Sequence, residues 1–323
     1  MDFAFTDEQD ELRRQTRAFL AERFPPERVA ELADSDAGWD PASWRELAEL
    51  GWLGVSAPEQ VGGAGLGFLE EAVLLEELGR ALYPGPFFST VALALAELPA
   101  DLQAQVVTGE VRWSASLDGT LVPDLALVDR VLVERDGALV AVAAEGETLE
   151  TVDSTRRLGR LADGGAGEQV GGADALGRIR VRAYAALAVE AVGIAQRALE
   201  LAVEHAKTRE QFGRPIGVYQ AISHRLADSY LETELARSLA YWAAWYVAEG
   251  DEQAPVAAAA AKSQASEVAV AVCERAIQAH GGIGFTWEHP LHRYYKRAEW
   301  IQAFGGFPAA QRAEVAAALL ETT

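Results

Sequence analysis

The chain has 323 residues, half of them apolar, and a formal net charge of −21. This length is enough for a packed core and about two domains. The strong negative charge argues against binding to nucleic acid or to an anionic membrane, because like charges repel. A single cysteine excludes an internal disulfide, and with only five scattered histidines it also excludes a Cys/His zinc cluster.

The sequence begins with an acidic segment broken by charges, which is not typical of a signal peptide. No apolar run has the length needed to span a bilayer. We therefore expect a cytoplasmic protein. Cys273 lies in a helical stretch rich in alanine and valine, so we interpret it as a small core residue.

Residues 1–105 are predicted to form a helical domain. Thr6 and Gln9 have the spacing of a capping box, which marks the start of a helix. Asp40 followed by proline marks a second start, and Gly51 is expected to end that helix. A glycine-rich loop then precedes another predicted helix at 67–82.

Residues 106–178 have a different pattern and are predicted to form a short β-rich middle domain. Residues 130–135 and 138–144 alternate as expected of short strands. The segment 161–177, rich in glycine, alanine and charges, is predicted to be a flexible connection.

Residues 179–323 are predicted to form a C-terminal antiparallel bundle of four helices, because long amphipathic segments follow one another with short connections. The fold class is therefore mainly α, with a small β-rich part between two helical parts. The helices are expected at 179–208, 217–249, 254–280 and 308–321.

Two places in the bundle are candidate ligand contacts, and the residues alone leave both open. Arg209 precedes a Gly/Pro turn, where a guanidinium could hold a pyrophosphate or simply complement the end of a helix. Gln278 is followed by Gly281 and Gly282, which allow close approach to a ligand but also suit an ordinary helix end.

Three stretches resemble the acyl-CoA dehydrogenases, namely 57–82, 191–228 and 278–298. The resemblance implies the fold of that family, an FAD cofactor and α,β-desaturation of an acyl-CoA thioester. It also implies contacts to the AMP half of a flavin that belongs to the neighbouring subunit. The residues that match these contacts are Arg209, Phe212, Gln220, Gln278, Gly281 and Gly282.

The family's catalytic base is missing at both positions where relatives carry it. One position is occupied by Gly305, in the string FGGF, and the other by Ala183, next to Tyr184. The family's segments that hold the flavin ring are also absent, with residues 109–119 standing where the first should be. Phe307 adds bulk beside the expected flavin position. We therefore expect no catalytic residue and no metal site in this chain.

The pattern favours a subunit that lends AMP-side contacts to a full-length partner dehydrogenase in a hetero-oligomer such as a heterotetramer. It is similar to the short subunit of paired actinobacterial enzymes that act on steroid side-chain thioesters. A self-sufficient homo-oligomeric dehydrogenase with a relocated base, Glu288 or Glu190, is the first alternative. A non-enzymatic helical scaffold is the second. We interpret His280, His289 and His292 as polar residues of a turn.

Overall fold

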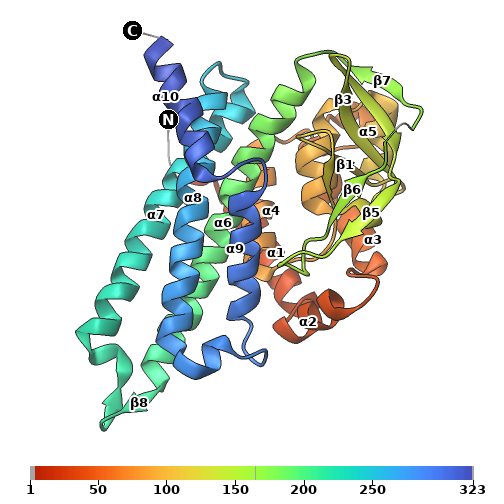
Figure 1. The fold of residues 1–323 in the computed structure, drawn as a ribbon. Coiled ribbons are helices and arrows are strands. Elements are labelled where there is room, and N and C mark those ends of the chain that lie inside the picture. Colours follow the sequence, from red (N-terminus) through yellow and green to blue (C-terminus); the bar gives the residue numbers. More distant parts are fainter. Residues whose placement is uncertain (1–3, 164, 322–323) are drawn as a thin grey trace.

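A computed structural model describes residues 4–163 and 165–321. Figure 1 shows a bundle of long helices, with the shorter N-terminal helices packed along one side of it and two small sheets beyond them. The mainly helical fold class is confirmed. No helix in the described ranges is both long and apolar enough to cross a membrane.

The N-terminal part begins with the predicted capping box: the Gln9 amide donates to Thr6 Oγ1 at 3.2 Å, and the Thr6 amide donates to Gln9 Oε1 at 3.1 Å. Asp40 caps the third helix through the Ala42 amide, and Gly51, with a φ of 75°, follows its end. The elements are α1 (Asp7–Arg23), α2 (Pro26–Asp34), α3 (Pro41–Glu49), α4 (Phe68–Ala81), the π-helical η3 (Phe88–Ala94) and α5 (Ala100–Val107).

The middle part contains two small sheets. The first has the order β1-β3-β4-β7, in which β1 pairs in parallel with β3 and the other pairs are antiparallel. The second has the order β2-β6-β5 and is antiparallel. The strands are β1 (Trp113–Ala115), β2 (Leu121–Pro123), β3 (Arg130–Arg135), β4 (Ala138–Ala143), β5 (Gly146–Leu149), β6 (Leu158–Leu161) and β7 (Glu168–Gly171).

Both predicted strands are present, as β3 and β4, but the predicted flexible connection at 161–177 is wrong in part. That segment contains β7, which pairs with the edge of β4, and it ends in the first turn of the bundle. The local sequence is rich in glycine and charged residues, which favour a loop. The strand forms because it pairs with β4, which is distant in the sequence, and a local pattern does not show such pairing. The boundaries of the three predicted domains remain a prediction.

The C-terminal bundle is built around α6 and α8, and α8 contacts α6, α7, α9 and α10. Two short strands, β8 (Glu210–Gln211) and β9 (Arg214–Pro215), form a hairpin between α6 and α7. The predicted bounds at 254–280 and 308–321 match. The helices are α6 (Ala175–Thr208), α7 (Gln220–Glu249), α8 (Ala254–His280), α9 (Leu291–Ala303) and α10 (Pro308–Glu321).

Helix α9 was not predicted, because its sequence is largely polar and aromatic. Its buried side chains nevertheless recur at helical spacing, as Leu291, Tyr294, Ala298 and Ile301 show. The helix matters for function because it leads into Gly305, one of the two positions where the family's base is expected.

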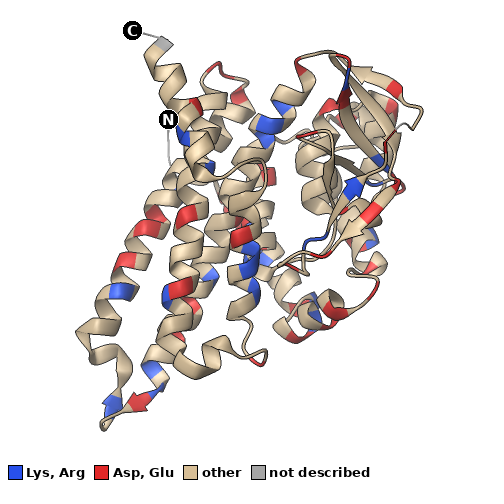
Figure 2. Cartoon of the chain, viewed as in Figure 1, with Lys and Arg blue, Asp and Glu red and all other residues tan. Residues whose placement is uncertain are grey.

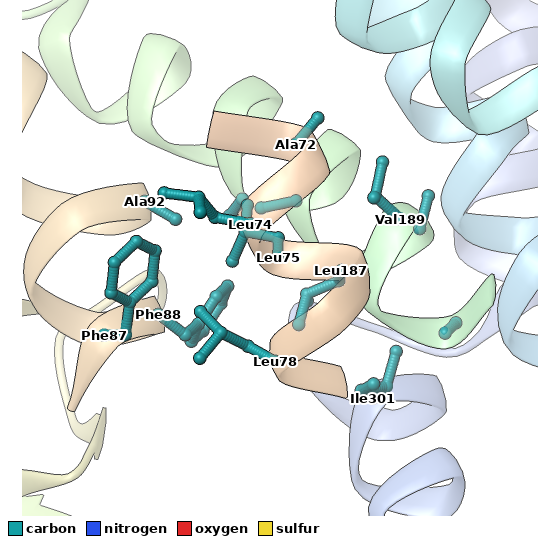
Figure 3. Close-up of a cluster of buried hydrophobic side chains, with 14 of the residues drawn as sticks. Ala72, Leu74, Leu75, Leu78, Phe87, Phe88, Ala92, Leu187, Val189 and Ile301 are labelled. Atoms are coloured by element: carbon teal, nitrogen blue, oxygen red, sulfur yellow. The ribbon is translucent and has the colours of Figure 1, made fainter. Parts of the chain in front are cut away.

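One hydrophobic core joins all three parts of the chain. Figure 3 shows its centre, where Leu74, Leu75 and Leu78 of α4 lie among Phe88, Leu187 and other apolar side chains. Helices α4 and α6 approach each other closely through glycine: a Cβ built on Gly193 would lie 2.0 Å from the Glu76 carbonyl oxygen. This contact brings the N-terminal helices against the bundle.

We expect Gly193→Ala to destabilise the protein by about 1–3 kcal/mol, because a methyl group in this contact forces the two backbones apart. Gly177→Ala is the matched control on the same helix, since nothing lies within 4 Å of its Cβ position. The control should be neutral or stabilise by roughly 0.4–1 kcal/mol, because alanine loses less backbone entropy on folding. Urea unfolding of both variants measures the difference, and equal stabilities would contradict the close α4–α6 contact.

Candidate functional site

The six residues predicted to contact a neighbour's FAD lie on the segments that close one end of the bundle, and all six are exposed. Figure 1 shows this end at the bottom, with the β8–β9 hairpin and the connection from α8 to α9. We call the six the bundle end: Arg209, Phe212, Gln220, Gln278, Gly281 and Gly282.

Phe212 has the most unusual conformation at the bundle end. It forms the two-residue turn of the hairpin with Gly213, and their φ angles are 53° and 77°. Two positive φ values suit the twist of such a hairpin, but a phenylalanine in this region carries a steric cost that asparagine or glycine avoids. The turn holds the ring outward, where the residue is 92% exposed. An aromatic residue held in water by a strained turn is a candidate for contact with another molecule.

Arg209 follows the last residue of α6 and has no hydrogen bond or salt bridge from its guanidinium to any residue in the described ranges. Gln278 lines a small crevice between α7 and α8, together with Ile222 and Arg225. Gly281 ends α8 with a φ of 64°, which is unfavourable for any other residue. The bundle end therefore offers an unpaired cation, amide groups and exposed backbone on one surface.

Behind this surface three imidazoles lie in a row: those of His205 and His280 stack, and that of His289 is tilted against His280. The ring centroids of His205 and His280 are 4.2 Å apart, and those of His280 and His289 are 4.3 Å apart. Burial and, to a smaller extent, the neighbouring histidines lower the pKa of His289 to about 4. His280 Nδ1 contacts the Ala276 carbonyl oxygen at 2.8 Å. The stack joins the ends of α6 and α8. Within the described ranges, no group of His, Cys, Asp or Glu is arranged to hold a metal ion.

The loop that follows α9 contains Gly305, and polar donors hold it in place. The Tyr184 hydroxyl donates to the Gly305 carbonyl oxygen at 2.7 Å. Gln311 Nε2 donates to the carbonyl oxygens of Gly305 and Gly306 at 3.2 and 3.0 Å. A Cβ built on Gly305 would lie 2.9 Å from Tyr184 Cε1, and the φ of 70° also disfavours a side chain. Tyr184 therefore occupies the space that a side chain at 305 needs.

Lys262 is a further donor to this loop. It is fully buried on α8, and its Nζ donates to the carbonyl oxygens of Gln302 and Gly306. Burial lowers its pKa to about 7, although Glu314 partly offsets the effect. Sequence reasoning missed this lysine, because a single lysine in an alanine-rich helix looks like a solvated residue.

A cavity of about 590 Å³ lies between the second sheet, α6 and the α9–α10 loop. Its wall is mostly apolar and includes Phe307, which is 59% exposed. Segment 109–119, which passes beside this cavity, uses its own hydroxyls internally: Ser114 Oγ donates to the Pro123 carbonyl oxygen and Ser116 Oγ to that of Leu121. These hydroxyls are therefore occupied and do not point to a ligand.

Glu190 lies in a buried ionic cluster. Its carboxylate accepts hydrogen bonds from Arg156 at 2.7 and 2.8 Å and from Arg297 at 2.6 Å. Arg297 also contacts Asp153 at 2.5 Å and Thr155 at 2.7 Å. Burial alone would raise the pKa of Glu190, but the two arginines outweigh it and hold that pKa below its ordinary value. The idea of Glu190 as a relocated base is therefore wrong, because the carboxylate is fully committed to cations.

Glu288, the other candidate for a relocated base, lies exposed in the connection between α8 and α9. A competent base in this chemistry must be within hydrogen-bond reach of a sequestered substrate. The exposed position gives Glu288 no enclosed pocket of its own.

Residues 6–100 match the family described as acyl-CoA dehydrogenase, N-terminal domain, and residues 180–320 match the acyl-CoA dehydrogenase C-terminal domain. The acyl-CoA dehydrogenase IpdE2 of Mycobacterium tuberculosis is 37% identical over 300 residues, which cover 90% of this chain and 91% of the relative. The chain belongs to the acyl-CoA dehydrogenase family.

Two solved structures are similar over nearly their whole length. The ChsE4–ChsE5 complex from Mycobacterium tuberculosis contains a chain with a TM-score of 0.92 and 29% identity, covering 100% of both chains. The G363A variant of the steroid acyl-CoA dehydrogenase Tcur3481–Tcur3483 contains a chain with a TM-score of 0.92 and 31% identity, covering 98% of both. The predicted family and its resemblance to paired steroid-type subunits are confirmed.

The central charges of this chain are paired with each other. The ion pairs of Glu190 with Arg156 and Arg297 connect α6 to α9 and to the loop between β5 and β6. Arginine and glutamate so far apart in the sequence give no local signal of pairing. Sequence reasoning therefore considered Glu190 for catalysis and did not consider the arginines.

We expect Glu190→Gln to lower the free energy of unfolding by about 3–5 kcal/mol at neutral pH, because it leaves two buried arginines short of a counter-charge. Since the native pKa of Glu190 is depressed, its contribution is complete above the ordinary value of 4.5 and is lost as the pH falls below it. The stability difference from wild type should therefore shrink in acid.

Glu288→Gln is the matched control, because it removes an exposed carboxylate and should change stability little. Denaturant unfolding of the three proteins across the acid range tests both statements. A pH-independent loss in Glu190→Gln would show that the carboxylate's charge is not what stabilises the fold.

Proposed function

We propose that this chain is a catalytically incomplete subunit of an FAD-dependent acyl-CoA dehydrogenase. In this proposal a full-length homologue binds the flavin and the acyl-CoA thioester, and the bundle end of this chain contacts the AMP side of that flavin. The proposal rests on a contrast between two parts of the chain. The bundle end is exposed, and its Arg209 has no ionic partner among the described residues. At Gly305, in contrast, Tyr184 fills the space that the side chain of a base would need.

The chemistry of the bundle end fits the AMP half of FAD. A guanidinium can hold a diphosphate with two parallel charge-assisted hydrogen bonds, and Arg209 has its donors free of protein partners among the described residues. Phe212 offers an exposed ring for apolar contact. Gln220 and Gln278 offer amides, and Gly281 and Gly282 expose backbone without side chains in the way.

The residues around Gly305 do not leave room for a catalytic base in this chain, which argues against a complete active site of its own. A glutamate at 305 would meet Tyr184 and would need an unfavourable backbone conformation. Ala183, at the other position, is fully buried and has no proton acceptor. The carbonyl oxygens of the loop accept from Tyr184, Gln311 and Lys262, so the closed geometry is also fixed by hydrogen bonds.

The similar structures support a hetero-oligomer. One is a complex of ChsE4 with ChsE5, and the other is the steroid acyl-CoA dehydrogenase Tcur3481–Tcur3483, whose name also has two components. By analogy, we propose that the partner's substrate is a bulky thioester of the steroid side-chain type and that the complex is cytoplasmic. Bound FAD would accept hydride from the acyl β-carbon, while the base would come from the partner.

The first prediction of this proposal concerns the chain alone. Expressed and purified without a partner, it should carry no stoichiometric flavin absorbance, because Tyr184 and the internally bonded segment 109–119 leave no cradle for the ring. A self-sufficient dehydrogenase would instead be yellow. Visible absorbance of the purified chain is the measurement, and one flavin per chain would rule out the proposal.

The second prediction concerns the complex with its partner. Arg209→Ala should give a complex that assembles but loses FAD on gel filtration, since a charge-assisted bidentate contact contributes about 1.5–3 kcal/mol, or roughly ten- to a hundredfold in retention. Arg209→Lys should rescue only in part, because an ammonium keeps the charge without the planar fork.

Arg45→Ala is the control, because it removes an equally exposed arginine from α3 in the N-terminal part of the chain. The flavin-to-protein ratio of the four complexes is the readout. Equal ratios in all of them would mean that Arg209 is an ordinary surface arginine, as expected of a scaffold that does not contact FAD.

A further inference from the structure

A second cavity, of about 390 Å³, shares no residue with the bundle end or with the cavity beside Gly305. It lies where the end of α1 and the start of α2 meet the end of α4, the middle of α6 and the start of α9. Four arginines from four helices line it, together with a single carboxylate, that of Glu77. The arginines are Arg17, Arg80, Arg197 and Arg293.

This concentration of positive charge is unusual in a chain with a net charge of −21. Figure 2 shows Lys and Arg positions along α9, whereas Asp and Glu positions are spread over many of the other elements. Arginines that converge from four separate helices are not a consequence of one charged stretch of sequence. The tertiary fold brings them together.

The carboxylates that pair with these arginines lie mostly outside the cavity. Arg80 and Arg197 share Glu200, and Arg293 pairs with Asp34 at 3.1 Å, while neither carboxylate lines the cavity. The Asp34 side chain is 67% exposed, so water screens much of its charge. Inside the cavity only Glu77, bonded to Arg17, opposes the four guanidiniums. The four guanidiniums therefore line the cavity with one carboxylate beside them, and their other counter-charges lie behind the wall.

The opposite wall of the cavity is apolar. It comes from the junction of α1 and α2 and from the end of α4, and it includes Leu20, Phe24, Pro25, Val29 and Leu82. Tyr294 lies between the two walls, but its hydroxyl donates to the Arg80 carbonyl oxygen at 2.9 Å. The cavity thus has one cationic side and one apolar side.

We propose that this cavity binds a small amphipathic organic anion, with its carboxylate or phosphate group among the arginines and its apolar body against the α1–α2 wall. Arginine forks suit the bidentate geometry of both kinds of anion. The volume falls in the range of small-molecule sites, roughly 300–1,000 Å³. Because the cavity shares no residue with the bundle end, this ligand is separate from the FAD of the proposed partner.

The test is isothermal titration of the full-length chain with four probes that share one apolar tail: octanoate, octyl phosphate, octanol and octylamine. Octanoate and octyl phosphate should bind, and their relative affinity identifies the preferred head group. Octanol and octylamine should bind at least about tenfold more weakly, since they lack a charge-assisted bond to arginine. Added salt should weaken binding of the two anions.

Two kinds of variant locate the site. Arg197→Gln and Arg293→Gln should each weaken binding of the better anion by about ten- to a hundredfold. Ala21→Phe keeps every charge but adds bulk at the exposed edge of the cavity, and it should also weaken binding. Arg178→Gln is the control, because it breaks a bidentate pair with Glu97 elsewhere on the surface and should leave affinity unchanged.

Three outcomes would overturn the proposal. Binding of octanol as tight as octanoate would show an apolar crevice with no role for the arginines. Unchanged affinity in Arg197→Gln, Arg293→Gln and Ala21→Phe would place the ligand elsewhere. No binding of either anion, with the chain folded by circular dichroism, would leave the arginines as structural ion pairs.

Discussion

The pairing of Glu190 with Arg156 and Arg297 is the interaction on which the arrangement of this subunit depends. Three charges, each nine-tenths or more buried, join α6 to α9 and to the loop between β5 and β6. Taking such charges out of water is costly, and only mutual pairing with further hydrogen bonds compensates. Asp153 and Thr155 supply those bonds to Arg297. Any large movement of α9 would separate the pairs, so the helix is fixed and the loop that follows it is fixed as well.

This constraint explains why the position of the base not only lacks a carboxylate but is also filled by neighbouring side chains. With α9 held, the Gly305 loop has one place to lie, and there its carbonyl oxygens meet the donors of Tyr184, Gln311 and Lys262. Glycine is required at 305 by the positive φ and by the Tyr184 ring. The absence of a base and the presence of a well-packed loop are therefore two aspects of one structure. Restoring a glutamate alone would oppose the packing around it.

Much of the fold could be predicted from local sequence signals. The capping box at Thr6, the proline after Asp40 and the strand pattern of residues 130–135 act over a few residues, and the predicted helix starts and strand are present. The alternation itself is not, because Val131, Leu132 and Val133 are all buried. The misses share a different cause. Strand β7, helix α9 and the buried Lys262 depend on partners far along the chain, and no local pattern carries that information. The candidate site was predicted from family motifs, and the structure adds that its residues are exposed.

The Gly305 loop and the bundle end differ in how their polar and aromatic side chains are used. At the Gly305 loop, carbonyl oxygens accept hydrogen bonds from Tyr184, Gln311 and Lys262 within the fold. The bundle end leaves Arg209 without a salt bridge among the described residues and holds Phe212 outward on a strained turn. A folded chain gains nothing from that exposure by itself, because the strain and the exposed ring both cost free energy. Contact with another molecule, as in the proposed hetero-oligomer, would offset this cost. The same reasoning applies to the cavity lined by Arg80, Arg197 and Arg293, whose counter-charges lie behind it rather than within it.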